Sequence, residues 1–265
     1  MVKIVVTLYN KGIKDSTTLL SLLECSHELT FCDIIIWDNS LAALSLSDFK
    51  LLNAKLKIIY HHTSANLPLS KIYNYVINNY ISESDYLLIL DDDSIFNKSL
   101  FENFFKAISR YNFINLILPI ITSNGKIISP ANNFIIKTSY WNKIKTGITS
   151  TKYLTAINSG MLISGRFLKG FNYDERLMFY GTDNYFMYNF RETNKNLFIV
   201  DEVIEHKLSF FEEDNSRRLF NFRETKRSNL IIYSKNTLHL ILSIINNAFV
   251  SIKYSIIYRS FKFLQ

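Results

Sequence analysis

A short apolar run that ends in three aspartates is the feature that most constrains the fold of this chain. Tyr86–Leu90 is apolar throughout, and the triplet Asp91–Asp93 follows it directly. An apolar run of this length between polar residues predicts a buried strand. Adjacent carboxylates repel one another and lose hydration on burial, so they do not belong in a strand interior. We therefore expect a cation site at the carboxyl end of a strand, the edge where open α/β sheets bind their ligands.

Strand-like and helix-like segments alternate through the first half of the chain. The predicted strands are 3–8, 33–37, 56–61 and 86–90, and the predicted helices are 13–29, 69–81 and 100–111. Such alternation is typical of βαβ units. In the less regular second half, runs at 114–121, 156–164 and 197–200 are strand-like, 183–192 is helix-like, and Asn124-Gly125 indicates a hairpin. The predicted fold class is α/β, with a Rossmann-like, mostly parallel central sheet flanked by helices and a C-terminal helical extension.

Composition excludes several classes of protein. The chain has 265 residues, of which 48% are hydrophobic and 15% aromatic, so it can bury a large core and is not globally disordered. Its two cysteines, Cys25 and Cys32, are too few for a disulfide framework or a zinc site. The apolar run behind Met1 is too short for a signal peptide, so we expect a reducing, cytoplasmic location.

Basic charge is concentrated in the C-terminal part of the chain. The net charge is +7, and residues 217–265 hold nine Lys or Arg and a single acid, Glu224. An apolar stripe at helical spacing runs through the same part: Leu238, Ile241, Leu242, Ile245, Phe249, Ile252 and Ile256. The pattern predicts an amphipathic helix that either lies on an anionic membrane surface or packs back on the body, and the uncharged stretch 236–252 is short for a membrane span. Nucleic acid is not the expected partner.

A second acid follows another predicted strand. Asp38 lies between the apolar run 34–37 and Asn39-Ser40. It could accept hydrogen bonds from a nucleotide base or ribose, or it could form an Asx turn. Neither the G-x-G-x-x-G fingerprint nor the P-loop motif is present. The phosphates of a bound nucleotide would therefore need a divalent cation, and the oxygens of Asp91 and Asp93 suit Mg²⁺ or Mn²⁺.

In their order along the chain, these segments resemble the family-2 glycosyltransferases of the GT-A fold. The resemblance rests on 5–10, 36–40 and 88–93, and it continues through Asn66, Asn74, 159–164, 170–175, 179–183 and His206. Leu67 stands where the family usually has a small glycine, and Thr182-Asp183 stands where it often has Glu-Asp. The resemblance covers about residues 3–210. It implies a catalytic domain 1–210, with a nucleotide-sugar-binding half 1–98 and an acceptor-binding half 99–210, followed by a basic tail 211–265.

The resemblance implies a metal-dependent, inverting hexosyl or rhamnosyl transfer from a UDP- or dTDP-sugar. The acceptor would be a hydroxyl of a lipid-linked oligosaccharide in bacterial O-antigen or capsule biosynthesis. The implied donor contacts are Thr7, Asp38, Lys71, Asp91 and Asp92; the implied ligands of Mn²⁺ or Mg²⁺ are Asp91 and Asp93; and the implied general base is Asp183. His206 could be a further ligand or a structural residue. The enzyme would be cytoplasmic and would contact the inner face of the membrane through 217–265.

Two other functions stay open at this point. A sugar nucleotidyltransferase would share the fold and the metal, but it normally needs a glycine-rich basic loop where 8–13 holds only Gly12. A non-catalytic binding module would not need the acids Asp38, Asp91, Asp93 and Asp183. Trp141 and the aromatic segment 171–190 could stack on sugar rings, or they could belong to the core.

Overall fold

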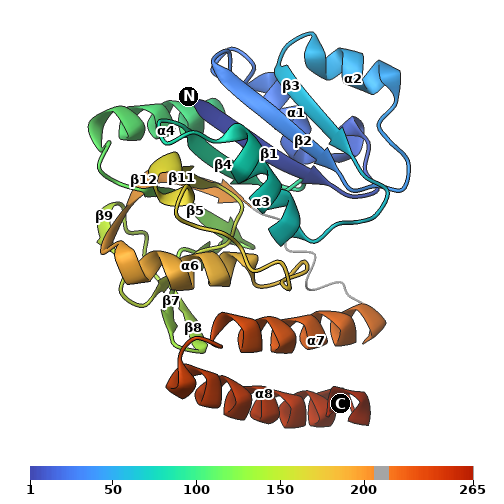
Figure 1. The fold of residues 1–265 in the computed structure, drawn as a ribbon, viewed down its shortest axis with the longest axis vertical. Helices are drawn as coiled ribbons and strands as arrows, with labels where there is room; N and C mark the ends of the chain where they lie inside the picture. The colour runs from blue at the N-terminus through green and yellow to red at the C-terminus, as the bar shows by residue number, and fades with distance from the viewer. Residues whose placement is uncertain (206–214, 265) are drawn as a thin grey trace.

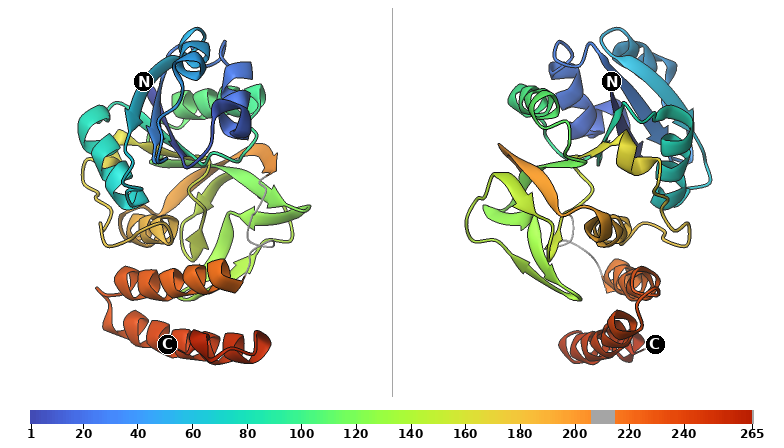
Figure 2. Two further views of the ribbon diagram at one scale, coloured as in Figure 1. Left: turned by 90° about the vertical axis from the view of Figure 1, so that its right-hand side faces the viewer. Right: turned by 60° about the vertical axis from the view of Figure 1, so that its left-hand side comes forward.

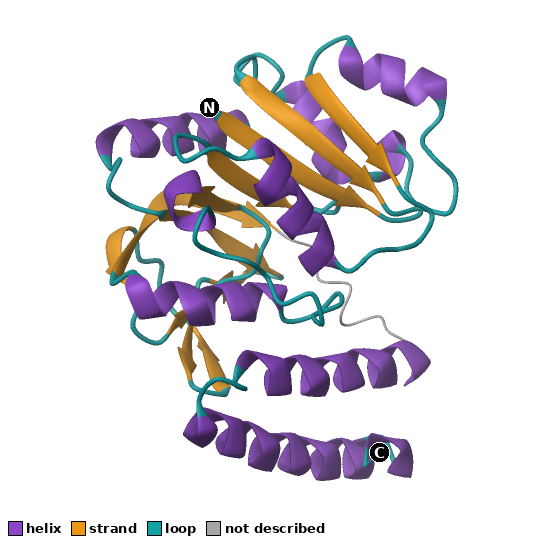
Figure 3. Cartoon of the chain, viewed as in Figure 1, coloured by secondary structure: helices purple, strands orange, loops and turns teal. Residues whose placement is uncertain are grey.

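The structure is a computed structural model that describes residues 1–205 and 215–264, and a large mixed sheet lies at its centre (Figures 1 and 3). The strands of this sheet are β1 (Val2–Leu8), β2 (Cys32–Asp38), β3 (Lys57–His62), β4 (Tyr86–Leu90), β5 (Leu116–Ser123), β6 (Lys126–Ser129), β9 (Gly147–Ser150), β11 (Met161–Ser164) and β12 (Asn196–Glu205). Their order is β3-β2-β1-β4-β11-β5-β12-β9, with β6 paired to β5. A smaller sheet has the order β10-β7-β8, from β7 (Ala131–Phe134), β8 (Lys137–Tyr140) and β10 (Leu154–Thr155).

The strands of the first half pair as the alternating pattern predicts. β3, β2, β1 and β4 are parallel to one another. β11 then runs antiparallel between β4 and β5, so it joins the two halves of the sheet. β12 is parallel to β5, and β9 is antiparallel to β12. The predicted α/β class with a mostly parallel central sheet is confirmed.

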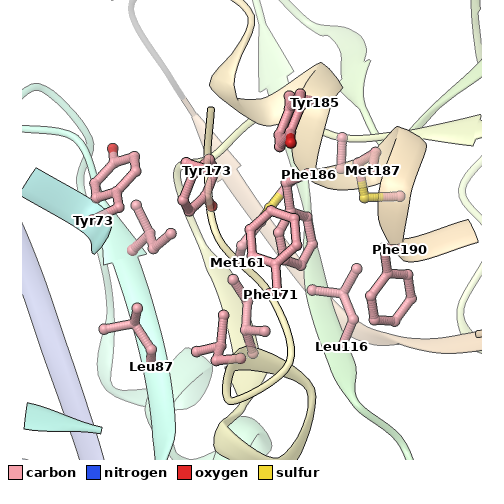
Figure 4. Close-up of a cluster of buried hydrophobic side chains, with 14 of the residues drawn as sticks. Tyr73, Leu87, Leu116, Met161, Phe171, Tyr173, Tyr185, Phe186, Met187 and Phe190 are labelled. Atoms are coloured by element: carbon pink, nitrogen blue, oxygen red, sulfur yellow. The ribbon is translucent and has the colours of Figure 1, made fainter. Parts of the chain in front are cut away.

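Helices cover both faces of the sheet because successive strand residues point to opposite sides. On one face α1 (Thr17–Glu24) and α4 (Lys98–Arg110) pack on Ile4, Val6, Ile34 and Ile36. On the other face α3 (Leu69–Tyr80) and α6 (Thr182–Thr193) pack on Val5, Ile35, Ile89 and Ile163. Figure 4 shows part of this second core, in which Phe171, Phe186 and Phe190 fill the space beside Met161. Each such side chain contributes about 1.5–3 kcal/mol by leaving water.

Several element boundaries differ from the predicted ones. The helix expected over 13–29 is a 3₁₀ turn (Ile13–Asp15) followed by α1, because the Ser16 side chain accepts a hydrogen bond from Leu19 N at 3.2 Å and so begins a new helix. The helix α2 (Leu46–Asn53) was not predicted. The run 156–164 becomes a strand only at Met161, after Gly160 with φ +84°. The hairpin at Asn124-Gly125 is confirmed, since both residues have positive φ, as a tight hairpin turn requires.

The C-terminal part forms a helix pair, which we call the C-terminal hairpin. It consists of α7 (Asn215–Ile232) and α8 (Thr237–Ile257), followed by a short 3₁₀ turn, Phe261–Phe263. α7 lies between α6 and α8, so α8 is the outermost layer of the molecule (Figures 1 and 2). Gly181, just before α6, faces Ser228 of α7 so closely that an added Cβ would stand 2.7 Å from the Ser228 Cβ. Among the described residues, α8 alone is long and apolar enough to cross a membrane by length and composition.

Candidate active site

The triplet Asp91–Asp93 begins where β4 ends, near the middle of the sheet. All five residues of β4 are buried, whereas each of the three aspartates is partly exposed. The Asp91 backbone N–H donates to Ser159 Oγ at 3.3 Å, and Ser159 lies in the turn before β11. The aspartates therefore lie at the edge shared by β1, β4 and β11, which is the position that the sequence predicts.

The three aspartates do not have equivalent surroundings. Asp92 Oδ1 forms an ion pair of 2.8 Å with Lys11 Nζ, from the loop after β1. The Asp92 carbonyl also accepts from the Ser16 hydroxyl at 2.8 Å, so this part of the turn is fixed against the start of α1. Lys11 is a site residue that the sequence argument missed, and its position directly behind the first strand is the signal that could have found it.

A fourth acid comes from the other half of the chain. Asp183 lies in the first turn of α6, where the helix dipole favours a carboxylate, and Asp183 Oδ1 accepts from Asn184 N at 2.7 Å. Burial raises the pKa of Asp183 to about 6, and nearby backbone N–H donors oppose that rise. α6 can begin here because Gly181 adopts φ +83°, a backbone conformation that glycine tolerates.

Asp183 and the triplet form one acidic cluster. Burial raises the pKa of Asp91 to about 7, and repulsion from Asp93, Asp92 and Asp183 adds to that rise. The structure thus brings together four of the predicted site residues from two distant parts of the sequence. We call Asp91, Asp92, Asp93 and Asp183 the carboxylate cluster.

Two buried tyrosines complete the surroundings of this cluster. The rings of Tyr73 and Tyr173 lie 5.4 Å apart between centroids, and Figure 4 shows them side by side. Burial raises the pKa of both phenols, and the charge of Asp183 adds to the rise at each, so both stay protonated. The Tyr173 hydroxyl has no hydrogen-bond partner among the described residues. Neither tyrosine was predicted as a site residue, because a tyrosine on the apolar side of a helix or in an aromatic segment looks like a core residue.

α3 fixes the segment that carries Tyr173. The Asn74 side chain donates to the Tyr173 carbonyl at 3.0 Å and accepts from the Tyr173 N–H at 2.8 Å. At the start of α3, Leu69 N donates to the Met178 carbonyl at 3.0 Å. Asn74 was predicted only as part of the family resemblance, and its observed contact is with the chain itself.

The predicted donor contacts Thr7, Asp38 and Lys71 have different environments. Asp38 is fully buried: its Oδ1 accepts from Ser40 N at 3.0 Å, and its Oδ2 accepts from the Tyr60 hydroxyl at 2.7 Å. This is the turn-forming alternative for Asp38, realised at the end of β2. Thr7 Oγ1 is enclosed and has no hydrogen-bond partner among the described residues, while Lys71 is exposed in the first turn of α3.

The carboxylate cluster fits a divalent cation only in part. No group of three His, Cys, Asp or Glu side chains in residues 1–205 and 215–264 is arranged to hold a metal ion. His206 lies outside the described residues. A hard cation between Asp91 and Asp93 would relieve the repulsion that raises the pKa of Asp91. Phosphate oxygens and water molecules would have to supply the rest of its coordination shell. The carboxylate oxygens of Asp91 and Asp93 would therefore suit Mg²⁺ or Mn²⁺ if a diphosphate completed the shell.

Two cavities lined by described residues lie away from the carboxylate cluster. One of about 980 Å³ is lined by the β5–β6 hairpin and by Trp141, and another of about 640 Å³ lies between Tyr153, Arg191 and His239. Trp141 is only 6% exposed, its Nε1 donates to Asn132 Oδ1 at 3.0 Å, and Lys145 lies over its ring. The core alternative for Trp141 is therefore the one observed.

No protein-family model matches this chain, and no curated protein matches it at the level of sequence. Solved structures do match it. TarS from S. aureus, residues 1–349, has 13% identity and a TM-score of 0.56, over 88% of this chain and 65% of that one. A longer TarS structure has 14% identity and a TM-score of 0.57, over 96% of this chain and 43% of that one. GalNAc-T7 with UDP, GalNAc and Mn²⁺ has 14% identity and a TM-score of 0.52, over 78% of this chain and 43% of that one.

TarS 1–349 has also been solved with UDP and with UDP-GlcNAc. This chain spans 43% to 66% of the length of these structures. At such low identities the likeness establishes the fold. These neighbours are glycosyltransferases of the GT-A fold, so the predicted GT-A architecture is confirmed.

Proposed function

We propose that this chain is an inverting glycosyltransferase that moves a sugar from a nucleotide-diphosphate donor to an acceptor hydroxyl. The observation that carries the proposal is the carboxylate cluster, in which the charge of Asp183 on α6 acts on Asp91 at the end of β4. The fold supports it, since neighbours with this fold were solved with UDP, with UDP-GlcNAc, or with UDP and Mn²⁺.

Asp183 would be the general base. No lysine or arginine among the described residues forms an ion pair with Asp183, and its pKa of about 6 suits proton uptake near neutral pH. The acceptor oxygen would lose its proton to Asp183 while it bonds to the anomeric carbon of the donor. The bond from that carbon to the diphosphate oxygen would break, and the nucleoside diphosphate would leave with the electron pair. One in-line displacement of this kind inverts the anomeric configuration.

The remaining residues would bind and orient the reactants. Tyr173, protonated and without a hydrogen-bond partner among the described residues, would orient the acceptor hydroxyl beside Asp183. Asp91 and Asp93 would hold Mn²⁺ or Mg²⁺, which would stabilise the charge of the leaving diphosphate. Asp92, held by Lys11, would fix the turn.

The predicted donor contacts on the other strands take supporting roles in this proposal. Asp38 would shape the loop 39–44, whose N–H groups it holds, as a wall for the base of the donor. Thr7 would lie behind that wall. Lys71, exposed at the start of α3, would approach the donor phosphates. A nucleotidyltransferase is less well supported, because the basic residue Lys11 behind β1 is already paired with Asp92.

The finer proposal concerns the acceptor and the setting. The basic C-terminal hairpin supports a lipid-linked oligosaccharide acceptor at the inner face of a bacterial cytoplasmic membrane, in surface polysaccharide biosynthesis such as that of O-antigen or capsule. Residues 1–98 would then bind the UDP- or dTDP-sugar, 99–210 would bind the acceptor, and 211–265 would bring the enzyme to the membrane.

The experiment is nucleotide release from a panel of UDP- and dTDP-sugars with Mn²⁺ and an acceptor panel. Asp183→Asn should lower kcat by about 100-fold or more while donor affinity stays unchanged, because only proton removal is lost. Asp91→Ala with Asp93→Ala should abolish donor binding. Asp201→Asn, an exposed acid on β12, is the matched control and should behave as wild type. Wild-type turnover by Asp183→Asn would reject the proposed base.

A further inference from the structure

α8 has the reverse orientation of an amphipathic helix in a soluble domain. Its buried residues are polar: Ser243, Asn247 and Ser251 are 0%, 7% and 4% exposed. They repeat every four residues and therefore lie on one side of the helix. A helix on the surface of a soluble protein normally buries its apolar side. Here it is the polar side that faces the protein.

Hydrogen bonds to α7 hold this polar side inward. Asn229 Nδ2 donates to Asn247 Oδ1 at 3.2 Å, and Asn247 Nδ2 donates to the Lys226 carbonyl at 3.2 Å. Lys226 Nζ donates to Ser251 Oγ at 3.1 Å. Because these bonds satisfy polar groups that are shielded from water, they fix which side of α8 remains outside.

The outward side of α8 is a continuous apolar row. Its members are between 47% and 72% exposed: Leu238, Ile241, Ile244, Ile245, Phe249, Ile252, Ile256 and Ile257. Phe261 and Leu264, just beyond the helix, are 83% and 50% exposed and extend the row. We call this set the apolar row. An uninterrupted set of large apolar side chains in water is unfavourable, so the row is expected to meet an apolar partner.

The charges of the C-terminal hairpin are almost all positive. The exposed basic residues of the C-terminal hairpin are Arg217, Arg223, Arg227, Lys235, Lys253, Arg259 and Lys262. Glu224 is the single acid of residues 215–264, and it lies 3.7 Å from Arg227. An exposed apolar row on a strongly basic hairpin matches an anionic lipid surface, which offers both acyl chains and phosphate groups. A second copy of this strongly basic hairpin would bring like charges together.

We propose that α8 lies in the plane of an anionic bilayer, with the apolar row among the acyl chains and the basic residues at the lipid phosphates. A spanning α8 would carry Asn247 and its hydrogen-bonded partners on α7 into hydrocarbon, or would lose them. The inference rests on the hairpin itself and goes beyond the proposed reaction. It adds that α7, which faces Gly181 just before α6, would hold Asp183 at a fixed distance from the lipid surface.

The test is co-sedimentation of the full chain with vesicles, with no donor or acceptor present. Wild type should bind vesicles of phosphatidylcholine and phosphatidylglycerol in about a 2:1 ratio, and should bind pure phosphatidylcholine about tenfold less. Phe249→Glu with Ile252→Glu and Ile256→Glu should weaken binding by about tenfold or more, because charges replace inserted side chains. The matched control is Phe31→Glu with Phe113→Glu, two exposed aromatic residues of the body, and it should bind as wild type.

Lys253→Ala with Arg259→Ala and Lys262→Ala gives an independent arm, since these exposed changes leave the apolar row intact. It should weaken binding to the anionic vesicles by about tenfold and leave the weak binding to phosphatidylcholine unchanged. The proposal would be overturned if both hairpin variants bound vesicles as strongly as wild type. It would also be overturned if wild type bound neither the anionic vesicles nor those of pure phosphatidylcholine. If wild type formed a dimer without lipid and the triple variant with Phe249→Glu did not, the apolar row would be the contact surface for a second copy of the chain. Nucleotide release on a water-soluble acceptor is measured separately, so failure of the membrane proposal leaves the proposed transfer reaction standing and removes only the membrane role given to 211–265.

Discussion

At the scale of single residues, like charge and burial act together on the carboxylate cluster. Asp91 and Asp183 both have raised pKa values, about 7 and about 6, although they lie on different halves of the chain. Burial disfavours the charged form of each, and the repulsion between carboxylates adds to the effect at Asp91. Such raised pKa values are typical of groups that exchange protons or bind cations.

The pH dependence of turnover follows from Asp183. A general base must be deprotonated, so kcat should rise with pH through about 6 and level off above about 7. The measurement is a pH–kcat profile at saturating donor and Mn²⁺. The acid limb should be missing from the residual activity of Asp183→Asn. An acid limb at the same pH in that variant would assign the titration to another group.

The pH dependence of stability follows from Asp91. Because its folded pKa of about 7 is raised above the unfolded value of 3.8, its contribution to stability is fully present below pH 4 and is lost as pH rises through 7. Without metal, Asp91→Asn should therefore raise the free energy of unfolding by about 4 kcal/mol at pH 8 and by much less at pH 4. Urea denaturation at both pH values measures this difference, and an equal effect at both would contradict it.

At the scale of elements, α3 connects the first half of the sheet to the segment beside Asp183. Two hydrogen bonds between the Asn74 side chain and the backbone of Tyr173, and one from Leu69 N to the Met178 carbonyl, fix the segment 173–178 on the helix. Asn74 is thus a positioning residue, which acts on the cluster through Tyr173.

Asn74→Ala should loosen Tyr173 without removing any donor contact. We expect kcat to fall by about tenfold, with the KM for the donor nearly unchanged and the KM for the acceptor raised. Asn74→Asp, which retains an acceptor for the Tyr173 N–H, should recover part of the loss. Asn79→Ala, which removes an exposed amide of the same helix, is the matched control. A uniform loss of stability with unchanged kinetics would make Asn74 merely structural.

At the scale of the whole molecule, the mixed sheet is what makes one site from two halves. β11 enters between β4 and β5, and its preceding turn brings Ser159 to the Asp91 backbone, while α6 follows and delivers Asp183. A ligand that binds across the carboxylate cluster should therefore stabilise the whole fold.

UDP with Mn²⁺ should raise the melting temperature by about 5 °C at ligand concentrations near 100 times Kd. UDP alone or Mn²⁺ alone should give a much smaller shift, because the carboxylates repel an unaccompanied diphosphate and provide too few ligands for the cation by itself. Asp93→Ala should lose the cooperative shift, whereas Asp201→Asn should keep it. Differential scanning fluorimetry makes the comparison. If UDP raised the melting temperature equally without any divalent cation, the proposal that a cation takes part in donor binding would be rejected.

The sequence by itself determined the α/β class, the mostly parallel arrangement of the sheet and the aspartates at the end of β4. These follow from local patterns, because an apolar run of five residues and a following polar turn depend on their own side chains. The predicted helix boundaries were wrong where a local hydrogen bond overrode the apolar pattern, as when the Ser16 side chain began a new helix.

Tertiary structure alone decided three features. Tyr73 and Tyr173 beside Asp183 cannot be told from core aromatics until the chain folds. The environment of Asp38 depends on Tyr60 from a neighbouring strand. The apolar stripe of α8 is visible in the sequence, but its orientation is not, because periodicity shows that a helix has two unlike sides and only its packing on α7 shows which one remains exposed.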